Sequence, residues 1–262
     1  MNKTLLEEII KKDYQSIQNK IGSFLLAEVS RRGSSGVIFG LSGGIDSAVI
    51  AAICAKSLKE KSLALVMPDS KITPRTDTED ALNFVDKLGL DYKLIDISLV
   101  HSEYSKYLEP NTLALGNLRA RIRSNILYYY ANSKNLLVLG SSDRSEYLIG
   151  YFTKFGDGAS DLLPIVSLYK TQIRDLAKSL GVPPSIVSKK SSPSLWPGHI
   201  AEDEIGLSYE EIDLILYCLT DKNLSLQETA SLAEVDPLLV DKIHKLYKKS
   251  EHKRITATIC QL

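Results

Sequence analysis

Apolar residues recur along the chain with two different periods, and their alternation predicts the fold. Residues 4–31 repeat apolar positions with helical spacing. Four short apolar runs follow that are typical of buried strands, at Val37–Leu41, Leu63–Met67, Tyr92–Ile97 and Leu136–Leu139. Helical patterns separate these runs, at residues 47–58, 75–89 and 113–131. We therefore predict an α/β fold, with a doubly wound, parallel, five-stranded sheet, helices on both faces and a helical C-terminal region.

The same pattern predicts a single domain over residues 1–262. An N-terminal helix at 1–31 precedes an α/β core at 36–180, and the C-terminal helices occupy 207–262. Between them, residues 189–206 are rich in Ser, Pro and Gly, which is typical of a long loop that covers a site as a lid. Residues 224–243 have a helix-turn-helix look, and they also fit an αα-hairpin that closes the fold.

Charge and composition restrict the partners. Lys and Arg number 32, equal to Asp and Glu, so no net charge attracts nucleic acid or an acidic membrane, and the αα-hairpin is favoured. The N-terminus lacks the apolar core of a signal peptide, and no apolar stretch approaches membrane length. Cys54, Cys218 and Cys260 have no metal-binding spacing. A cytoplasmic protein with no membrane or nucleic-acid partner is predicted.

The loop after the first strand carries the clearest chemistry. Residues 40–47 read Gly40-Leu41-Ser42-Gly43-Gly44-Ile45-Asp46-Ser47, and a helical pattern follows. Glycines let backbone N–H groups approach a phosphate, and a helix N-terminus adds partial positive charge. The loop is neither a Walker A loop nor a Gly-x-Gly-x-x-Gly turn. The alternative is an ordinary strand–helix turn in which Asp46 caps the helix.

Two carboxylates follow neighbouring strands and predict a metal site. In doubly wound sheets the ligand lies beyond the carboxyl ends of the strands, so the segments after each strand should converge. Asp46 follows the first strand and Glu146 the fourth. Hard oxygen ligands beside a phosphate site suit Mg²⁺. The alternative for Glu146 is a surface ion pair with Arg144 or Lys154.

A polar stripe lies on the helix that follows residue 113. Its members share one face by spacing, and they are Asn117, Arg121, Asn125 and Tyr128. Because a planar guanidinium suits a carboxylate or a phosphate, Arg121 is a binding candidate. Arg119 and Arg123 are interpreted as solvated arginines.

Several motifs together resemble a known family. The Ser-Gly-Gly-x-Asp-Ser loop resembles that of the ATP pyrophosphatase superfamily, which attacks the α-phosphate of ATP and releases pyrophosphate. Further motifs cover nearly the whole chain, at residues 116–123, 140–146, 150–158, 161–165, 168–172, 195–198 and 251–254. Their order and spacing are similar to ammonia-dependent NAD synthetases. The segment Thr153-Lys154-Phe155-Gly156-Asp157-Gly158 is the most diagnostic.

The resemblance implies a reaction and a set of site residues. Deamido-NAD would be amidated with ammonia through an adenylated carboxylate, releasing AMP and pyrophosphate. The implied ATP site comprises Gly40, Leu41, Ser42, Gly43, Gly44, Ile45, Asp46, Ser47, Ser141, Lys170 and Ser192. Asp46 and Glu146 would hold Mg²⁺. The implied deamido-NAD site comprises Arg121, Lys154, Asp161, His252 and Lys253. No covalent catalytic residue is assigned, and Asp157 is the candidate to orient or deprotonate ammonia.

The resemblance also implies a homodimer with the substrate near the subunit interface. We expect no glutaminase domain, because the synthetase occupies all 262 residues, and therefore expect free ammonia as the nitrogen source. The chain departs from the family pattern at Ser141, where Thr is usual, in the lid around Ser192, and at His199-Ile200-Ala201, where Gln-Thr-Asp is commoner. The rival interpretations are a tRNA-modifying enzyme with this loop, which should show paired cysteines and a basic surface, and a nucleotide-binding regulator that uses residues 224–243 on DNA.

Overall fold

A parallel sheet forms the centre of the computed structural model, which describes residues 1–192, 195–196, 198–255 and 257–261. Its strands are β1 (Gly36–Gly40), β2 (Ser62–Val66), β3 (Asp91–Leu94) and β4 (Leu136–Leu139). They lie in the order β3-β2-β1-β4, and all pairs are parallel. The chain therefore reverses its winding direction between β1 and β4, which makes that boundary the topological switch point.

The predicted number of strands is wrong, because the described sheet has four strands and not five. Leu162 forms a single parallel bridge with Leu139, beside β4. Both Asp161 N and Leu162 N donate to Val138 O, at 2.8 and 3.2 Å. Pro164 follows, and its lack of an N–H group prevents it from donating a hydrogen bond to a continued ladder. The segment therefore pairs with the sheet at one residue only.

Helices cover both faces of the sheet, as predicted. One core contains Val37 and Phe39 and is covered by α2 (Tyr14–Arg31), α3 (Ile45–Ser57), α4 (Arg75–Leu88) and α8 (Lys170–Ser179). The opposite core contains Ile38 and is covered by α6 (Thr112–Lys134), with α5 (Ser98–Ser105) packed against α6. Because successive strand residues point to opposite faces, β1 contributes to both cores.

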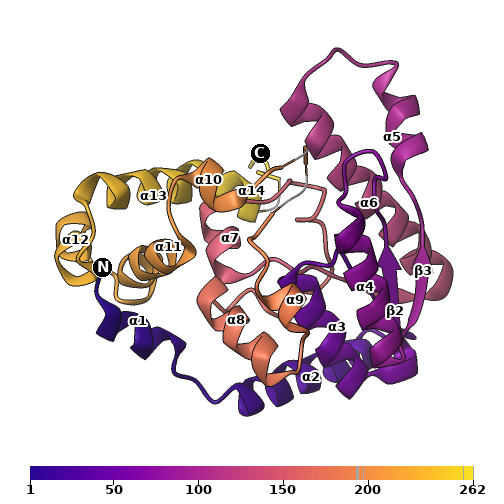
Figure 1. The fold of residues 1–262 in the computed structure, drawn as a ribbon, viewed down its shortest axis with the longest axis horizontal. Helices are drawn as coiled ribbons and strands as arrows, with labels where there is room; N and C mark the ends of the chain where they lie inside the picture. The colour runs from indigo at the N-terminus through magenta and orange to yellow at the C-terminus, as the bar shows by residue number, and fades with distance from the viewer. Residues whose placement is uncertain (193–194, 197, 256, 262) are drawn as a thin grey trace.

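The N-terminal region divides into two helices where one was predicted. These are α1 (Lys3–Ile10) and α2, and Asp13 caps the second by accepting a hydrogen bond from Ser16 N at 3.0 Å. Leu5 and Ile9 of α1 are buried among the C-terminal helices rather than against the sheet. Figure 1 shows α1 beside α11 and α12, away from β2 and β3.

The remaining helices include those that form a third core, around Tyr209 and Ile212. They are the 3-10 turn Lys59–Lys61, α7 (Arg144–Ile149), α9 (Pro184–Val187), α10 (Ala201–Ile205), α11 (Tyr209–Leu216), the π-helical turn Tyr217–Asp221, α12 (Leu226–Ala233), α13 (Pro237–Lys249) and α14 (Glu251–Arg254). The pair α12 and α13 packs as an αα-hairpin against α11. Helix α10 lies within the segment predicted as a lid loop, and residues 193, 194 and 197 of that segment lie outside the described residues. Among the described helices, none combines the length and apolar composition needed to cross a membrane.

Candidate functional site

The carboxyl ends of the strands open onto one cavity of about 480 Å³. Its walls include all of residues 40–47, together with Met67 after β2 and Ser141 after β4. Lid residues close another side, among them Ser192 and His199. The segments predicted to converge therefore do so at the switch point between β1 and β4.

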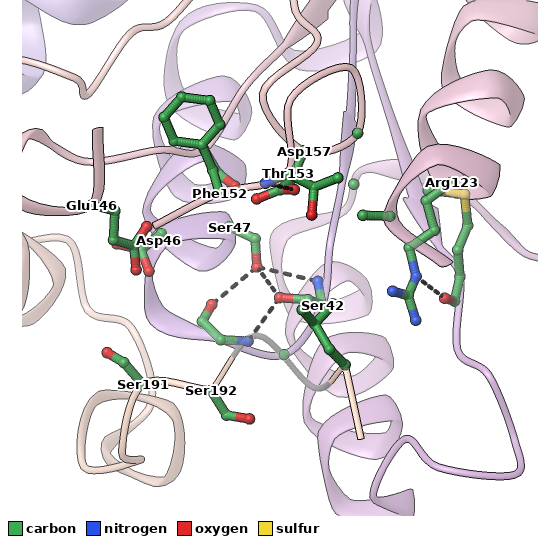
Figure 2. Close-up of a pocket in the computed structure, with 18 of the residues that line it drawn as sticks. Ser42, Asp46, Ser47, Arg123, Glu146, Phe152, Thr153, Asp157, Ser191 and Ser192 are labelled. Carbon is green, nitrogen blue, oxygen red and sulfur yellow. Dashed lines mark hydrogen bonds between the residues drawn. The ribbon is translucent and has the colours of Figure 1, made fainter. Parts of the chain in front are cut away.

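The loop after β1 is held in shape by its own serines (Figure 2). Ser42 N donates to Ser47 Oγ at 3.1 Å, and Gly44 N donates to Ser42 Oγ at 3.2 Å. Gly43 adopts a φ of +81°, and a Cβ there would lie 2.2 Å from Asp77 O, so only glycine fits. The loop leads directly into the N-terminus of α3, which has 13 residues. This geometry suits an anionic phosphate.

Three carboxylates surround one lysine beside the loop. Lys170 Nζ lies 2.7 Å from Asp46 Oδ2, 2.8 Å from Asp143 Oδ2 and 2.8 Å from Glu146 Oε1. We call Asp46, Asp143 and Glu146 the acidic cluster. The side chains of Lys170 and Asp143 are 0% exposed, and those of Asp46 and Glu146 are 18% exposed. The alternative partners of Glu146 are engaged elsewhere, because Arg144 pairs with Asp221 and Lys154 donates to His252 O.

Sequence reasoning missed Asp143. This residue precedes α7 and caps it, since its Oδ1 accepts from Glu146 N at 2.8 Å. Its position as an N-cap directly after a buried strand was the available signal.

Burial dominates the electrostatics of the cluster. It raises the pKa of Glu146 well above the usual range and the pKa of Asp143 to about 6, although Lys170 opposes both shifts. Burial also disfavours the Lys170 ammonium, but the three carboxylates outweigh it and raise the pKa of Lys170 well above the usual range. One ammonium thus faces three carboxylates.

The cluster fits a divalent cation. Each of its members offers an oxygen, and these oxygens lie within 4.8 Å of one another. Asp46 Oδ1 is buried and accepts no hydrogen bond from any described residue. Hard carboxylate oxygens with unused lone pairs are the ligands that Mg²⁺ prefers.

The other residues predicted for ATP lie in different surroundings. Ser141 lines the cavity, and Ser192 does so while its hydroxyl donates to His199 O. Lys170 is wholly enclosed and is absent from the described cavity wall. The structure therefore brings Ser141 and Ser192 to the cavity but keeps Lys170 among the carboxylates.

A polar network fixes the end of the lid. His199 Nε2 lies 2.7 Å from Glu204 Oε2 and 3.1 Å from Tyr151 OH, and Tyr151 OH donates to Glu204 Oε2 at 2.6 Å. The Trp196 ring stacks on the His199 ring with centroids 3.5 Å apart. The lid is therefore joined to the segment that follows α7.

The residues predicted for deamido-NAD mostly contact main-chain groups. Arg121 is exposed and donates to Lys154 O at 3.3 Å, while Lys154 Nζ donates to His252 O at 2.5 Å. Lys253 Nζ donates to Gly150 O and Phe152 O, at 2.7 and 2.8 Å. Asp161 lies apart, and its Oδ2 accepts from Val138 N at 2.8 Å. We call these five residues, Arg121, Lys154, Asp161, His252 and Lys253, the dinucleotide side, of which Lys253 alone lines the described cavity.

Asp157 faces the cavity beside Thr153 (Figure 2). Its Oδ1 accepts from Thr153 N at 2.9 Å, and Thr153 Oγ1 donates to Asn117 Oδ1 at 2.7 Å. The Asn117 of the polar stripe on α6 thereby holds the loop that carries Asp157.

Arg119 and Arg123 are not solvated, contrary to the sequence interpretation. Arg119 Nε lies 2.7 Å from Asp69 Oδ2, with the two side chains 14% and 0% exposed. Arg123 Nε donates to Met67 O at 2.8 Å and lines the cavity. Both partners follow β2, so the contacts join α6 to the carboxyl end of a strand. The one sequence signal for these contacts was Asp69, a carboxylate just after a predicted strand.

A glycine-rich loop at the switch point of a parallel sheet, with carboxylates at the adjoining strand end, defines an α/β protein built to bind a nucleotide phosphate. The family model described as NAD synthase matches residues 17–257. The chain belongs to the NAD synthase family, as its motifs predicted.

Named relatives agree with this assignment. The NH(3)-dependent NAD(+) synthetase of Hyperthermus butylicus is 49% identical over 252 residues, which are 95% of this chain and 91% of that protein. The solved NH3-dependent NAD synthetase of Campylobacter jejuni is 37% identical, with a TM-score of 0.82 over 96% of this chain and 100% of that chain. The solved NMN synthetase of Francisella tularensis is 33% identical, with a TM-score of 0.85 over the same shares.

Proposed function

We propose that this protein is an ammonia-dependent NAD synthetase, which uses ATP to amidate deamido-NAD and releases AMP and pyrophosphate. Its family membership and its near full-length similarity to relatives of that name support this function. The observation that carries it is that the loop at residues 40–47 and two members of the acidic cluster, Asp46 and Glu146, line one cavity.

The reaction requires activation of a carboxylate. Ammonia cannot expel oxide from a carboxylate, so the nicotinate oxygen first attacks the α-phosphorus of ATP and pyrophosphate leaves. Ammonia then attacks the acyl carbon, AMP leaves with the former carboxylate oxygen, and one proton is lost from nitrogen. The protein contributes alignment and charge neutralisation more than a nucleophile.

The ATP end of the site comprises residues 40–47, Ser141, Lys170 and Ser192. Backbone N–H groups of the loop and the α3 N-terminus bind the phosphates. Asp46 and Glu146 would hold Mg²⁺, which would supply positive charge to the pyrophosphate group. Lys170 adds positive charge to the phosphates, and Ser192 contacts ATP from the lid.

The dinucleotide side binds deamido-NAD. Arg121 and Lys154 supply positive charge, and His252, Lys253 and Asp161 complete the contacts. Asp157 accepts the proton that ammonia loses, since its carboxylate faces the cavity. We further propose that residues 1–262 form a single synthetase domain, that the protein is a homodimer with the substrate near its interface, and that it is a cytoplasmic enzyme that uses free ammonia.

A direct assay tests the proposal. The protein is incubated with ATP, Mg²⁺, ammonium and deamido-NAD, and NAD, AMP and pyrophosphate are followed by chromatography. Equal amounts of the three products are expected with ammonium, and none with glutamine in its place. ATP cleavage without NAD formation would contradict deamido-NAD as the substrate. No ATP cleavage at all would contradict the proposed enzymatic activity.

A second acceptor belongs in the same assay. The name of the Francisella tularensis relative refers to a mononucleotide product. Nicotinate mononucleotide therefore replaces deamido-NAD in a parallel reaction. We expect the dinucleotide to be preferred, and a preference for the mononucleotide would reassign the substrate while keeping the chemistry.

A further inference from the structure

Lys170 occupies the centre of the acidic cluster, where a cation belongs. Its ammonium lies 2.7 to 2.8 Å from one oxygen of each carboxylate, and its side chain is 0% exposed. The Tyr209 ring covers the ammonium at 5.2 Å, and Tyr209 OH donates to Glu146 Oε1 at 3.3 Å. The Lys170 ammonium is therefore surrounded by carboxylate oxygens, as a bound metal ion would be.

The backbone of Lys170 is fixed, whereas its ammonium lies at the end of a long side chain. Lys170 begins α8, and its N–H donates to Ser145 Oγ at 2.9 Å. Four methylene groups separate this anchor from the ammonium, so Nζ can move by rotation about side-chain bonds. The N-terminus of a helix is itself partially positive, so the carboxylates are what stabilise the ammonium there.

A metal and the ammonium cannot share this centre. A divalent ion bound by Asp46 and Glu146 would lie close to Nζ, which now contacts one oxygen of each of these carboxylates. Two cations so close would repel each other strongly in a buried site. Entry of the metal therefore requires Lys170 to give up Asp46 and Glu146.

Displacement of Lys170 also needs a new partner for its charge. An unpaired ammonium in an enclosed position is very unfavourable. The phosphates of ATP in the adjoining cavity are the anions that could accept it, and in the present arrangement Lys170 does not reach the cavity wall.

We propose that Lys170 is an internal substitute for the metal, which holds Asp46 and Glu146 until ATP arrives and then exchanges them for the triphosphate as Mg²⁺ takes its place. Lys170 is in this sense a positioning residue that makes metal binding depend on nucleotide. The inference rests on the proposed function only for the identity of the nucleotide and the metal.

Binding of Mn²⁺ tests the exchange without any turnover. Electron paramagnetic resonance follows free Mn²⁺ during titration of the protein, with and without α,β-methylene-ATP, which cannot be cleaved at the α-phosphate. In the native protein we expect weak binding alone and binding at least about tenfold tighter with the analogue, after correction for Mn²⁺ bound to the free analogue. Equally tight binding in the two titrations would overturn the proposal, whatever the activity assay shows.

Lys170→Met removes the competing charge and keeps an unbranched side chain that is one atom shorter. We expect this variant to bind Mn²⁺ without nucleotide at least about tenfold more tightly than the native protein. Its melting temperature should rise with Mn²⁺ alone, while that of the native protein should not, because only the variant has a vacant centre. Affinity unchanged from native would overturn the proposal.

Lys190→Met is the matched control. Lys190 also lines the cavity but makes no described ion pair. If Lys190→Met strengthens Mn²⁺ binding as much as Lys170→Met does, then the loss of any nearby positive charge explains the effect. The proposed exchange of Lys170 for the metal would then be refuted. If the Lys170 variant does not fold, the paired titrations of the native protein still decide. If the protein shows the exchange but forms no NAD, this inference stands and the proposed substrate is wrong.

Discussion

The ATP end and the dinucleotide side use their charged residues differently. Around the acidic cluster, charged side chains contact one another and are largely buried. On the dinucleotide side, the cationic side chains Arg121, Lys154 and Lys253 donate to backbone carbonyl groups, and Arg121 is exposed. We therefore expect the charges at the ATP end to exchange partners with a ligand. Charges on the dinucleotide side also hold the chain in place, so we expect residues such as Lys253 to affect both binding and stability.

The sharpest test of this difference is Asp46→Asn. If Asp46 binds the metal as proposed, loss of its charge should lower kcat for NAD formation by about a thousandfold or more. The free energy of unfolding should stay the same or increase, because the change removes one of three carboxylates that compete for one ammonium. Initial rates at saturating substrate and urea unfolding measure the two effects. Substantial activity in the variant would contradict the role of Asp46.

Arg121→Met separates binding from stability on the dinucleotide side. The side chain is exposed and makes one long hydrogen bond, so the free energy of unfolding should change by less than about 0.5 kcal/mol. The KM for deamido-NAD should rise about 10- to 100-fold through the loss of a charged contact. Arg75→Met is the control, since Arg75 is exposed on α4 and pairs only with Glu79 among its described contacts. A KM equal to that of the control would remove Arg121 from the site.

In contrast to Arg121→Met, Lys253→Met should clearly lower the stability of the protein. The Lys253 ammonium serves two carbonyl groups, Gly150 O and Phe152 O, and burial lowers its pKa. Its loss leaves both acceptors without this donor and should lower the free energy of unfolding by about 1 to 3 kcal/mol.

Denaturant unfolding measures this loss, with Lys248→Met as the control. Lys248 lies near the end of α13, the helix that precedes the one carrying Lys253, and its ammonium lies over the Tyr247 ring, so its removal should change little. If the two variants unfold alike, the coupling of binding and stability on this side is absent.

The sequence predicted those features that depend on local pattern. The strands β1 and β4, the loop at 40–47 and the helices on both faces follow from hydrophobic period and from glycine and serine at fixed positions. The prediction of a fifth strand, for which the pattern gave no position, is wrong, because the segment beside β4 pairs only at Leu162 and reaches Pro164 two residues later. The break between α1 and α2 arises because Asp13 caps a new helix.

Features that depend on distant partners were not predictable from the sequence. Asp143 looks like an ordinary helix cap, and only the fold brings Lys170 against its second oxygen. From the sequence Arg119 is interpreted as solvated. Its partner, Asp69, lies fifty positions away along the chain, and only the fold brings the two side chains together. Motif resemblance supplied roles for residues such as Lys170 and Lys253, but it did not indicate that one is enclosed by carboxylates and the other holds two carbonyl groups.

The smallest expected effect belongs to the lid, where His199→Gln tests whether side-chain contacts or main-chain contacts place Ser192. Ser192 Oγ donates to the backbone oxygen of residue 199, and Ala201 N donates to Ser191 O at 2.9 Å, so both contacts survive the substitution. The imidazole contacts with Glu204 and Tyr151 are lost or weakened. The KM for ATP should therefore rise only about threefold, with kcat nearly unchanged.

Tyr151→Phe is the matched comparison, because it removes a hydroxyl from the same Glu204 and leaves His199 in place. Similar small effects on the KM for ATP are expected in the two variants, measured from initial rates at varied ATP. A large loss of kcat in His199→Gln alone would instead place the imidazole at the reacting atoms. The lid would then resemble the ATP end, where charged side chains are proposed to contact the ligand directly. His199 would have to be counted among the residues of the ATP end.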